Sequence, residues 1–244
     1  PGTTPRRLLA MLVRGEESLR TLTLVEGWNW RQVRQALARA ELLKPDSQGL
    51  SDEDLMARLG RPGVAPEGRF YPDTYSYARN SSDLKVLARA LKAMDRQLGK
   101  AWAARAPTVA LRSADEALIL ASIVEKETGK GVDRPMIASV FHNRLRIGMP
   151  LQTDPTVIYG LGEAFDGNLK RIHLRTDTPW NTYTRTGLPP TPIAMPGKAA
   201  LLAAVQPAAS QALYFVARGD GSSHFSSSLG EHNQAVNRYQ RGQK

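Results

Sequence analysis

The chain has 244 residues, of which 41% are hydrophobic, and it contains no cysteine. This length can bury one large core or two small ones, and the lack of cysteine excludes disulfide scaffolds, thiolate zinc sites and cysteine nucleophiles. With 33 Lys and Arg against 23 Asp and Glu, the formal net charge is +10, which favours polyanionic partners such as nucleic acid, acidic lipid or carboxylate-rich cell wall.

The apolar stretches of the sequence are too short to cross a bilayer. The longest, such as 117–124, fall far below the roughly 20 residues that a membrane helix needs, and no basic and then apolar leader precedes them. The sequence therefore predicts a globular protein. Because the chain begins at Pro1 rather than Met, a leader or anchor could have been removed from it.

The segment from 21 to 77 has the pattern of a strand, two helices and a second strand. Residues 21–25 alternate as a strand does, 29–43 repeat apolar residues at helical spacing, and Ser51 can cap a shorter helix. The aromatic stretch 70–77 is β-prone. This order resembles a LysM-type module, a small fold associated with N-acetyl-hexosamine glycans. The alternative is a generic α+β lobe that braces the rest of the chain.

Helices are also expected further along the chain. Asn80 to Asp83 predicts the start of a long amphipathic helix that runs through Leu98. Ser113 can cap another helix, with Glu116 three residues later satisfying a second backbone donor reciprocally, and this helix is expected to end near Thr128 at two glycines.

The remainder of the sequence predicts short elements joined by loops. A helix is expected to start at Asp133 and Pro135, and beyond Met149 the chain is rich in Pro, Gly, Thr and Asn, which predicts loops that carry binding residues. A β-hairpin around 219–221 and a terminal helix over 231–239 complete the prediction.

Glu127 is the strongest candidate for chemistry in the predicted helix 114–128. On a helical wheel of about 100° per residue, Glu127 lies about 50° from the apolar centre and Glu125 about 110° from it. Glu127 is therefore expected to be half-buried, which raises a carboxyl pKa as a general acid requires. The alternative is that Glu127 forms an ion pair with Lys130 or with an arginine of the next helix.

Several motifs in a fixed order carry a resemblance that covers nearly the whole chain. They are Ala121-Ser-Ile-Val-Glu-Lys-Glu-Thr128, Ala138 to Gly148, Leu151 to Gly160, Glu67-Gly-Arg-Phe-Tyr-Pro-Asp-Thr-Tyr75, Asn181-Thr-Tyr183, Gly187-Leu-Pro-Pro190 and Glu231-His-Asn233. Together they resemble the YceG/MltG family of membrane-anchored endolytic murein transglycosylases. The family's catalytic glutamate maps to Glu127, and Glu127-Thr128 resembles the Glu-Ser pair of goose-lysozyme-like lytic enzymes. His142 departs from the pattern, where an apolar or small residue is expected.

The resemblance implies an endolytic lytic transglycosylase, a lyase without cofactor or metal. Such an enzyme cleaves the β-1,4 bond between N-acetylmuramic acid and N-acetylglucosamine without water, leaves 1,6-anhydro ends and sets glycan strand length. Glu127 would protonate the glycosidic oxygen and then accept the proton of the muramic C6 hydroxyl. Ordinary glycosidases need two carboxylates for hydrolysis.

Six further residues are candidates for substrate binding. Gln152, Asp154, Asn181 and Tyr183 lie in the loops, where they suit hydrogen bonds to N-acetyl and hydroxyl groups, although turn chemistry explains them equally well. Asp154 is the second carboxylate if the reaction is hydrolytic. Asn143 and Arg144 are expected to orient Glu127 or to bind a peptide carboxylate, or else to form pairs on the helix surface. We interpret His224 and His232 as structural, and Tyr71, Tyr75, Trp28 and Trp30 as core residues.

We therefore predict an α+β protein in which a small LysM-like βααβ lobe precedes a larger mixed α/β catalytic lobe with a lysozyme-like catalytic helix. The expected divisions are a helical lead-in at 1–20, the LysM-like subdomain at 21–79, a bridging helix and linker at 80–112, and the catalytic domain at 113–244.

Two other functions compete with the lytic transglycosylase. One is a non-catalytic peptidoglycan-binding or scaffold protein of the wall-synthesis machinery. The other, suggested by charge alone, is nucleic-acid binding, which no recognised motif supports. The resemblance also implies an inner-membrane anchor ahead of Pro1, a periplasmic catalytic domain and glycan polymerases (penicillin-binding proteins) as partners. Basic residues are enriched only at Arg134, Arg144, Arg146, Lys170, Arg171, Arg175 and Arg185, which leaves both a solvated surface and an anion-binding face open.

Overall fold

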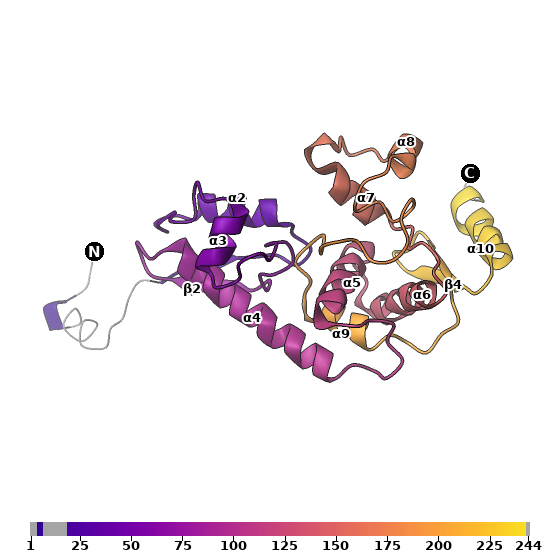
Figure 1. Cartoon of the computed structure of the whole chain (residues 1–244), viewed down its shortest axis with the longest axis horizontal. Coiled ribbons are helices and arrows are strands. Elements are labelled where there is room, and N and C mark those ends of the chain that lie inside the picture. The colour runs from indigo at the N-terminus through magenta and orange to yellow at the C-terminus, as the bar shows by residue number, and fades with distance from the viewer. Residues whose placement is uncertain (1–3, 7–18, 243–244) are drawn as a thin grey trace.

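The computed structural model describes residues 4–6 and 19–242, so the predicted helical lead-in at 1–20 lies almost entirely outside the described residues. The described helices and strands follow in chain order (Figure 1): β1 (Arg20–Thr23), α2 (Trp30–Arg39), α3 (Asp52–Arg58), β2 (Thr74–Tyr77), α4 (Asp83–Ala103), α5 (Ala114–Glu127), η1 (Gly131–Asp133), α6 (Arg134–Arg146), α7 (Asp154–Leu161), η2 (Gly162–Ala164), α8 (Arg171–Arg175), α9 (Lys198–Val205), β3 (Tyr214–Ala217), β4 (Ser223–Ser226), α10 (Leu229–Val236) and η3 (Asn237–Arg241). The fold is mixed α and β, as predicted.

The first lobe has the predicted order of strand, helix, helix and strand. β1 and β2 pair antiparallel with Leu22 opposite Tyr75, and both side chains are buried. Asn29 and Gln32 form a capping box at the start of α2, and this helix ends at Arg39, earlier than predicted. Ser51 caps α3 as expected. The two helices and the two-stranded sheet thus close a small core.

Helix α4 belongs to two hydrophobic cores. Its first turns contribute Val86, Leu87, Ala90 and Leu91 to the core of the first lobe. Its later turns contribute Met94, Leu98 and Ala101 to a second core, formed mainly with α5, α6 and α9. Figure 1 shows α4 running diagonally beneath both parts of the molecule. The helix therefore bridges the two cores, with one apolar face divided between them.

Helix α5 lies in the middle of the second core. It packs against α4, α6 and α9, and every residue from Leu120 to Val124 is buried. Ser113 caps it, but Glu116 accepts the backbone N–H of Arg112 at 2.6 Å rather than that of Ser113, which corrects the predicted reciprocal cap. The helix ends because Thr128 takes an extended conformation, φ −146° and ψ 135°. Because α5 packs against three other helices, the position of its C-terminal end is fixed.

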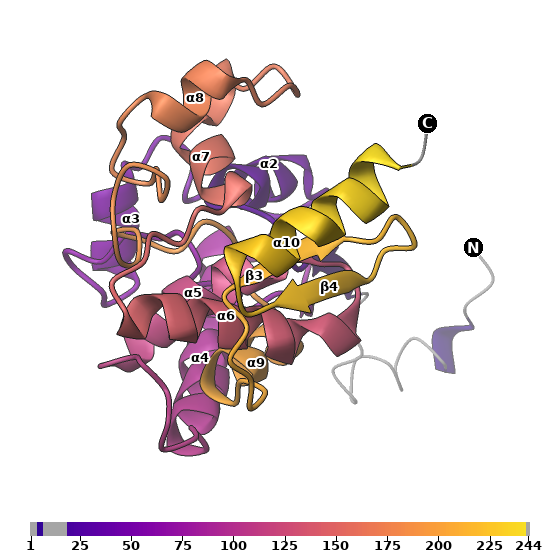
Figure 2. The same cartoon turned by 90° about the vertical axis from the view of Figure 1, so that its right-hand side faces the viewer.

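The C-terminal part supplies loops and a hairpin around α5 and α6. α7 and α8 rise as an arm above the second core (Figure 1). β3 and β4 form the predicted antiparallel hairpin, with Phe215 opposite Phe225. Helix α10 lies across this hairpin (Figure 2), begins at Leu229 and continues into the π-helical turn η3. Segments after residue 149 thus fold back over α5 and α6.

His142 connects three segments of the second core. The ring is fully buried, Nδ1 accepts the backbone N–H of Ala110 at 3.0 Å, and Nε2 lies 2.8 Å from the carbonyl oxygen of Ala204. Because Nδ1 accepts, Nε2 carries the hydrogen and donates. Burial lowers the pKa of His142, so the neutral ring is the stable form. His142 thus takes the place of the expected apolar residue, and both of its ring nitrogens have hydrogen-bond partners.

Replacing His142 by Leu is expected to lower the free energy of unfolding by roughly 2–4 kcal/mol, because the partly buried N–H of Ala110 and the buried carbonyl of Ala204 lose their partner. Urea denaturation measures the change. His142→Gln, which retains a donor and an acceptor, is the matched control and should lose less; equal stability of His142→Leu and the wild type would contradict the assignment.

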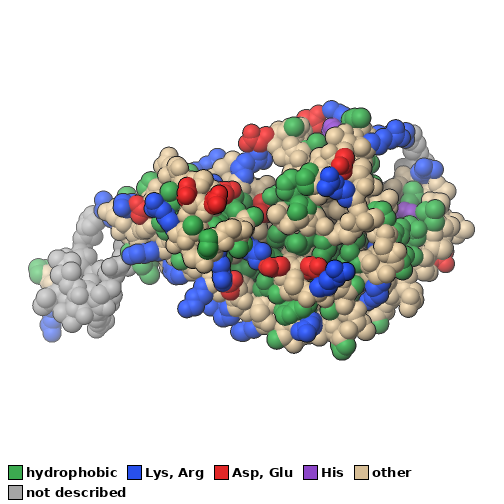
Figure 3. Space-filling view, in the orientation of Figure 1, with side chains coloured by type: hydrophobic (Ala, Val, Ile, Leu, Met, Phe, Trp, Pro, Cys, Tyr) green, Lys and Arg blue, Asp and Glu red, His purple; other side chains and the backbone are tan. Residues whose placement is uncertain are grey.

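Charged side chains are dispersed over the face seen in Figure 3. Lys and Arg side chains are spread across this face and alternate with Asp and Glu, while hydrophobic side chains gather beneath the arm of α7 and α8. Within residues 4–6 and 19–242 there is no helix with the length and apolarity that a membrane span requires. On this face the distribution favours a solvated surface over an anion-binding face.

Candidate active site

The end of α5 meets the start of α7, and this junction positions Glu127. Glu127 is the last residue of α5, and Thr153, immediately before α7, donates a hydrogen bond from Oγ1 to its carboxylate. Thr153 is itself fixed, because its backbone N–H donates to Oγ1 of Thr182 at 3.1 Å and Thr156 Oγ1 donates to its carbonyl at 2.8 Å. Two buried threonines, Thr156 and Thr182, therefore hold Thr153, which orients Glu127.

The environment of Glu127 raises the pKa of its carboxyl to about 7. Burial is the main cause and the nearby charge of Asp154 adds to it, whereas the Thr153 hydrogen bond and the charge of Arg144 act in the opposite direction. Among the described residues, no cation forms an ion pair with Glu127. A carboxyl that is half protonated near neutral pH can both donate and accept a proton.

Glu125 is also buried, contrary to the prediction from the helical wheel. Its side chain is only 6% exposed, and it forms an ion pair with Arg134 of α6 at 2.9 Å while accepting the backbone N–H of Gly197 at 2.9 Å. The ion pair considered for Glu127 is thus made by Glu125. The two carboxylates differ in their partners, since Glu125 is paired with a cation and Glu127 is not.

Glu127 lines a cavity of about 370 Å³. Four of the other predicted residues lie around the same cavity, namely Arg144, Gln152, Asp154 and Tyr183. The hydroxyl of Tyr183 donates to Oδ1 of Asp154 at 2.6 Å. Gln152 has a left-handed backbone, φ 49°, which a hydrogen bond from its N–H to the carbonyl of Thr182 holds in place. The cavity therefore joins an acid, a hydrogen-bonded carboxylate, an amide and a cation.

Arg144 forms a fixed positive wall of this cavity. The side chain is buried, Nε donates to the carbonyl of Leu213 at 2.7 Å, and Nη1 donates to that of Leu151 at 2.7 Å. Its Cζ lies 5.4 Å from the ring centroid of Tyr214. Backbone carbonyls and an aromatic face hold the guanidinium, so its charge acts on Glu127 without a direct ion pair.

Two predicted binding residues lie outside the cavity, and their side chains are already bonded. Asn181 is fully buried; its Nδ2 donates to carbonyls of the α8 region, including that of Thr176 at 2.7 Å, and its Oδ1 accepts the N–H of Tyr183. Asn143 donates to the carbonyls of Ser210 and Ala212, both at 2.9 Å. The side-chain amides of Asn143 and Asn181, predicted to orient Glu127 and to bind sugar, are thus bonded to loop carbonyls.

The C-terminal hairpin and α10 contribute cavity residues that the sequence did not single out as a site. These are Tyr214, Phe215, Leu229 and His232. His232 stacks on Tyr214 with ring centroids 5.2 Å apart, and its buried Nδ1 has no hydrogen-bond partner among the described residues. The motif Glu231-His-Asn233 was the available signal, but only the tertiary fold brings it to the cavity.

Asp154→Asn is expected to lower the pKa of Glu127, because removing a nearby negative charge makes ionisation of that carboxyl easier. The basic limb of a plot of log kcat/KM against pH should then move to lower pH than in the wild type. Tyr183→Phe keeps the charge of Asp154 and is the control for the lost hydrogen bond. An unchanged basic limb in Asp154→Asn would show that the two carboxyls are not coupled.

Comparison with known proteins places the chain in a family. The profile of the YceG-like family matches residues 1–238. The chain is 38% identical to the endolytic murein transglycosylase of Bacillus subtilis (strain 168) over 71% of this chain and 48% of that protein. It is 30% identical to that of Streptococcus pneumoniae serotype 2 (strain D39 / NCTC 7466) over 91% of this chain and 45% of that protein. The chain thus spans about half the length of the curated relatives it matches.

A solved structure shares the fold. A crystal structure of a yceG-like protein from Listeria monocytogenes is 30% identical, superposes with a TM-score of 0.70, and is matched over 96% of this chain and 81% of that chain. The match to the family profile extends along almost the entire sequence and includes the segment around Glu127. This chain belongs to the YceG-like family.

Proposed function

We propose that this chain is the catalytic part of an endolytic lytic transglycosylase that cleaves the MurNAc-β-1,4-GlcNAc bond of peptidoglycan. The observation that carries the proposal is Glu127, a carboxyl with a pKa raised to about 7 by burial, without a cationic partner among the described residues, on the wall of a cavity. The names of the relatives from Bacillus subtilis and Streptococcus pneumoniae support the same activity.

In the first step, protonated Glu127 donates its proton to the glycosidic oxygen as the bond from that oxygen to C1 of muramic acid breaks. Thr153 orients the carboxyl during this transfer. The carboxylate that results lies within the field of Arg144, which favours the charged form. The protein thereby supplies an acid near neutral pH and stabilises its conjugate base.

In the second step, the Glu127 carboxylate accepts the proton of the muramic C6 hydroxyl, whose oxygen attacks C1 and closes a 1,6-anhydro ring. Glu127 is protonated again, so one residue completes the cycle without water. The N-acetyl group of the substrate can stabilise the positive charge at C1 between the steps. Asp154 accepts a hydrogen bond from Tyr183 and serves as the second carboxylate only in a hydrolytic reaction.

Mass spectrometry of peptidoglycan strands digested with the purified protein tests this proposal. We expect internal cleavage products with 1,6-anhydro-muramic ends from the wild type and none from Glu127→Gln. Products with only reducing ends would replace the mechanism by hydrolysis. Binding without any product, in wild type and variant alike, would support a scaffold protein instead.

The proposal extends to location and partners. We propose an inner-membrane anchor ahead of the chain, a periplasmic catalytic domain, and glycan polymerases as partners whose nascent strands are cut to length. We also propose that residues 21–79 form a LysM-like subdomain that binds glycan. Residues 80–112 would then form the bridge and residues 113–244 the catalytic domain. Co-purification of polymerases with the membrane-anchored protein would test the partnership.

A further inference from the structure

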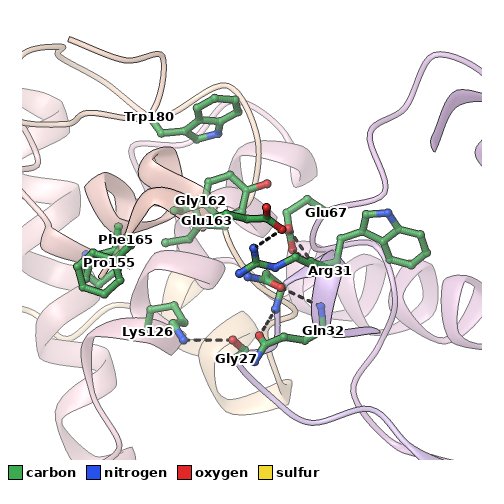
Figure 4. A pocket seen from close by; sticks show the side chains of 15 residues that line it. Gly27, Arg31, Gln32, Glu67, Lys126, Pro155, Gly162, Glu163, Phe165 and Trp180 are labelled. Carbon is green, nitrogen blue, oxygen red and sulfur yellow. Dashed lines mark hydrogen bonds and ion pairs between the residues drawn. The ribbon is translucent and has the colours of Figure 1, made fainter. Parts of the chain in front are cut away.

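A second and larger cavity lies between the first lobe and the arm of α7. Its volume is about 670 Å³, within the range of ligand sites, and Figure 4 shows side chains from α2, α7, η2 and the loop after α8 around it. Arg31 of α2 and Glu163 of η2 form an ion pair of 3.0 Å that joins the two sides. Residues of three family motifs, Glu67, Lys126 and Pro155, line this cavity, but the mechanism above does not use it.

Aromatic surface is available in this cavity at Trp180. The indole is partly buried, its Nε1 donates to Oγ1 of Thr191 at 2.9 Å, and Tyr159 meets it edge-on with centroids 5.5 Å apart. Trp30 also lines the cavity, but Phe70 stacks on its ring at 5.0 Å and Arg34 lies over it at 5.1 Å. Trp180 is therefore the indole that can accept a flat apolar ligand face.

The polar groups of the cavity suit a neutral ligand. The side-chain oxygens of Asn29 and Gln32 accept backbone N–H groups in the α2 capping box, which leaves their NH₂ groups as donors. The two cations already have partners, because Arg31 is paired with Glu163 and Lys126 donates to the carbonyl of Gly27 at 3.2 Å. Amide donors and an aromatic ring lining one cavity fit a ligand that carries hydroxyl and acetamido groups as well as C–H faces.

Glu67 adds a buried carboxyl to the cavity. Both of its oxygens accept the backbone N–H of Trp30, at 3.1 and 3.0 Å, and Tyr159 is a further hydrogen-bond partner. Burial raises the pKa of Glu67 to about 7, and no cation forms an ion pair with it among the described residues. Near neutral pH Glu67 is therefore about half protonated, so it contributes less than a full negative charge to the cavity.

The second cavity adjoins the catalytic one. Lys126 and Pro155 line the larger cavity, while their neighbours in sequence, Glu127 and Asp154, line the smaller one. Both cavities thus reach the junction between the end of α5 and the start of α7. A chain molecule that crosses this junction would occupy both cavities, and a polymer cut internally must extend on both sides of the broken bond.

We propose that the cavity between α2 and α7 binds N-acetylhexosamine units of the same glycan strand that is cut at Glu127, with Trp180 as the stacking surface. This inference rests on the proposed function, which identifies the bound polymer as a peptidoglycan glycan strand. The aromatic face, the free amide donors and the adjoining catalytic cavity carry it.

Binding of a β-1,4-linked N-acetylglucosamine hexamer to the Glu127→Gln protein tests the inference by calorimetry. Adding Trp180→Ala should weaken hexamer binding roughly tenfold, which corresponds to about 1.4 kcal/mol. Phe165 also lines the cavity and belongs to neither hydrophobic core, so Phe165→Ala should also weaken hexamer binding. Trp102→Ala on α4 is the matched control and should leave affinity unchanged; melting temperatures show that each variant is folded.

The inference and the proposed function can fail separately. Hexamer affinity that is unchanged in both Trp180→Ala and Phe165→Ala would overturn the second site, whatever the products of the wild type. Loss of hexamer affinity in these variants, together with a wild type that makes no anhydro ends, would overturn the proposed reaction and leave the saccharide site supported.

Discussion

Glu127→Gln is expected to lower kcat by roughly 10²–10⁴-fold, the range for loss of a general acid or base. Gln keeps the shape of the side chain and can still accept the hydrogen bond from Thr153, but it cannot give up a proton to the glycosidic oxygen. Release of anhydro-muramic fragments, quantified by liquid chromatography and mass spectrometry, measures the loss.

The same substitution should stabilise the fold at alkaline pH. The pKa of Glu127 is about 7 in the folded protein, above its ordinary value of 4.5, so the stability it contributes is complete below pH 4.5 and is lost as the pH rises through 7. Gln has no charge to bury, and the variant should exceed the wild type by about 3 kcal/mol at pH 8 and by little at pH 4. Urea denaturation at both pH values checks this, and a variant less stable than the wild type at pH 8 would contradict it.

Glu125→Gln, two residues earlier on the same helix, is expected to do the opposite. It should lower the free energy of unfolding by about 3 kcal/mol, because Arg134 would remain buried at 13% exposure without its charge partner. Nη2 of Arg134 makes the bond to Glu125, and its buried Nε has no hydrogen-bond partner among the described residues. The carboxyl of Glu26 interacts electrostatically with both Glu125 and Arg134. Because Glu26 still partly balances the charge of Arg134 when Glu125 is replaced, the expected loss is at the lower end of the range for broken buried ion pairs.

Denaturation at pH 8 and activity of the folded fraction distinguish these two carboxylates. Glu125→Gln should retain turnover wherever it is folded, since Glu125 does not line the cavity of Glu127. Loss of turnover in folded Glu125→Gln, with activity retained in Glu127→Gln, would reverse the assignment of the acid.

The local elements were predictable because their signals lie close together in the sequence. Ser51, Ser82 and Ser113 each cap the helix that follows them, and the alternating residues around Gly219 and Gly221 form the hairpin. The burial of Glu125 was not predictable in this way. Its partners are Arg134 on the next helix and the N–H of Gly197, 72 residues away, and a helical wheel contains neither.

The site was predictable only in part, because its residues come from distant segments. Asp154 and Tyr183 lie 29 residues apart and meet at the cavity, as their polar character suggested. Asn181 has the same polar character, yet its amide is fully buried among loop carbonyls. His232 reaches the cavity only because α10 folds back over the hairpin. Residue type indicates which groups can bind, whereas tertiary contacts decide which of them remain free.

The division of α4 between two cores has a consequence for how the protein unfolds. Its 21 residues form one continuous helix, and loss of either core would expose apolar residues of a segment that the other core still holds. The two lobes are therefore expected to melt in a single cooperative transition, with calorimetric and van't Hoff enthalpies that agree. The same helix makes a rigid strut of roughly 30 Å, which fixes the spacing between whatever the two lobes hold.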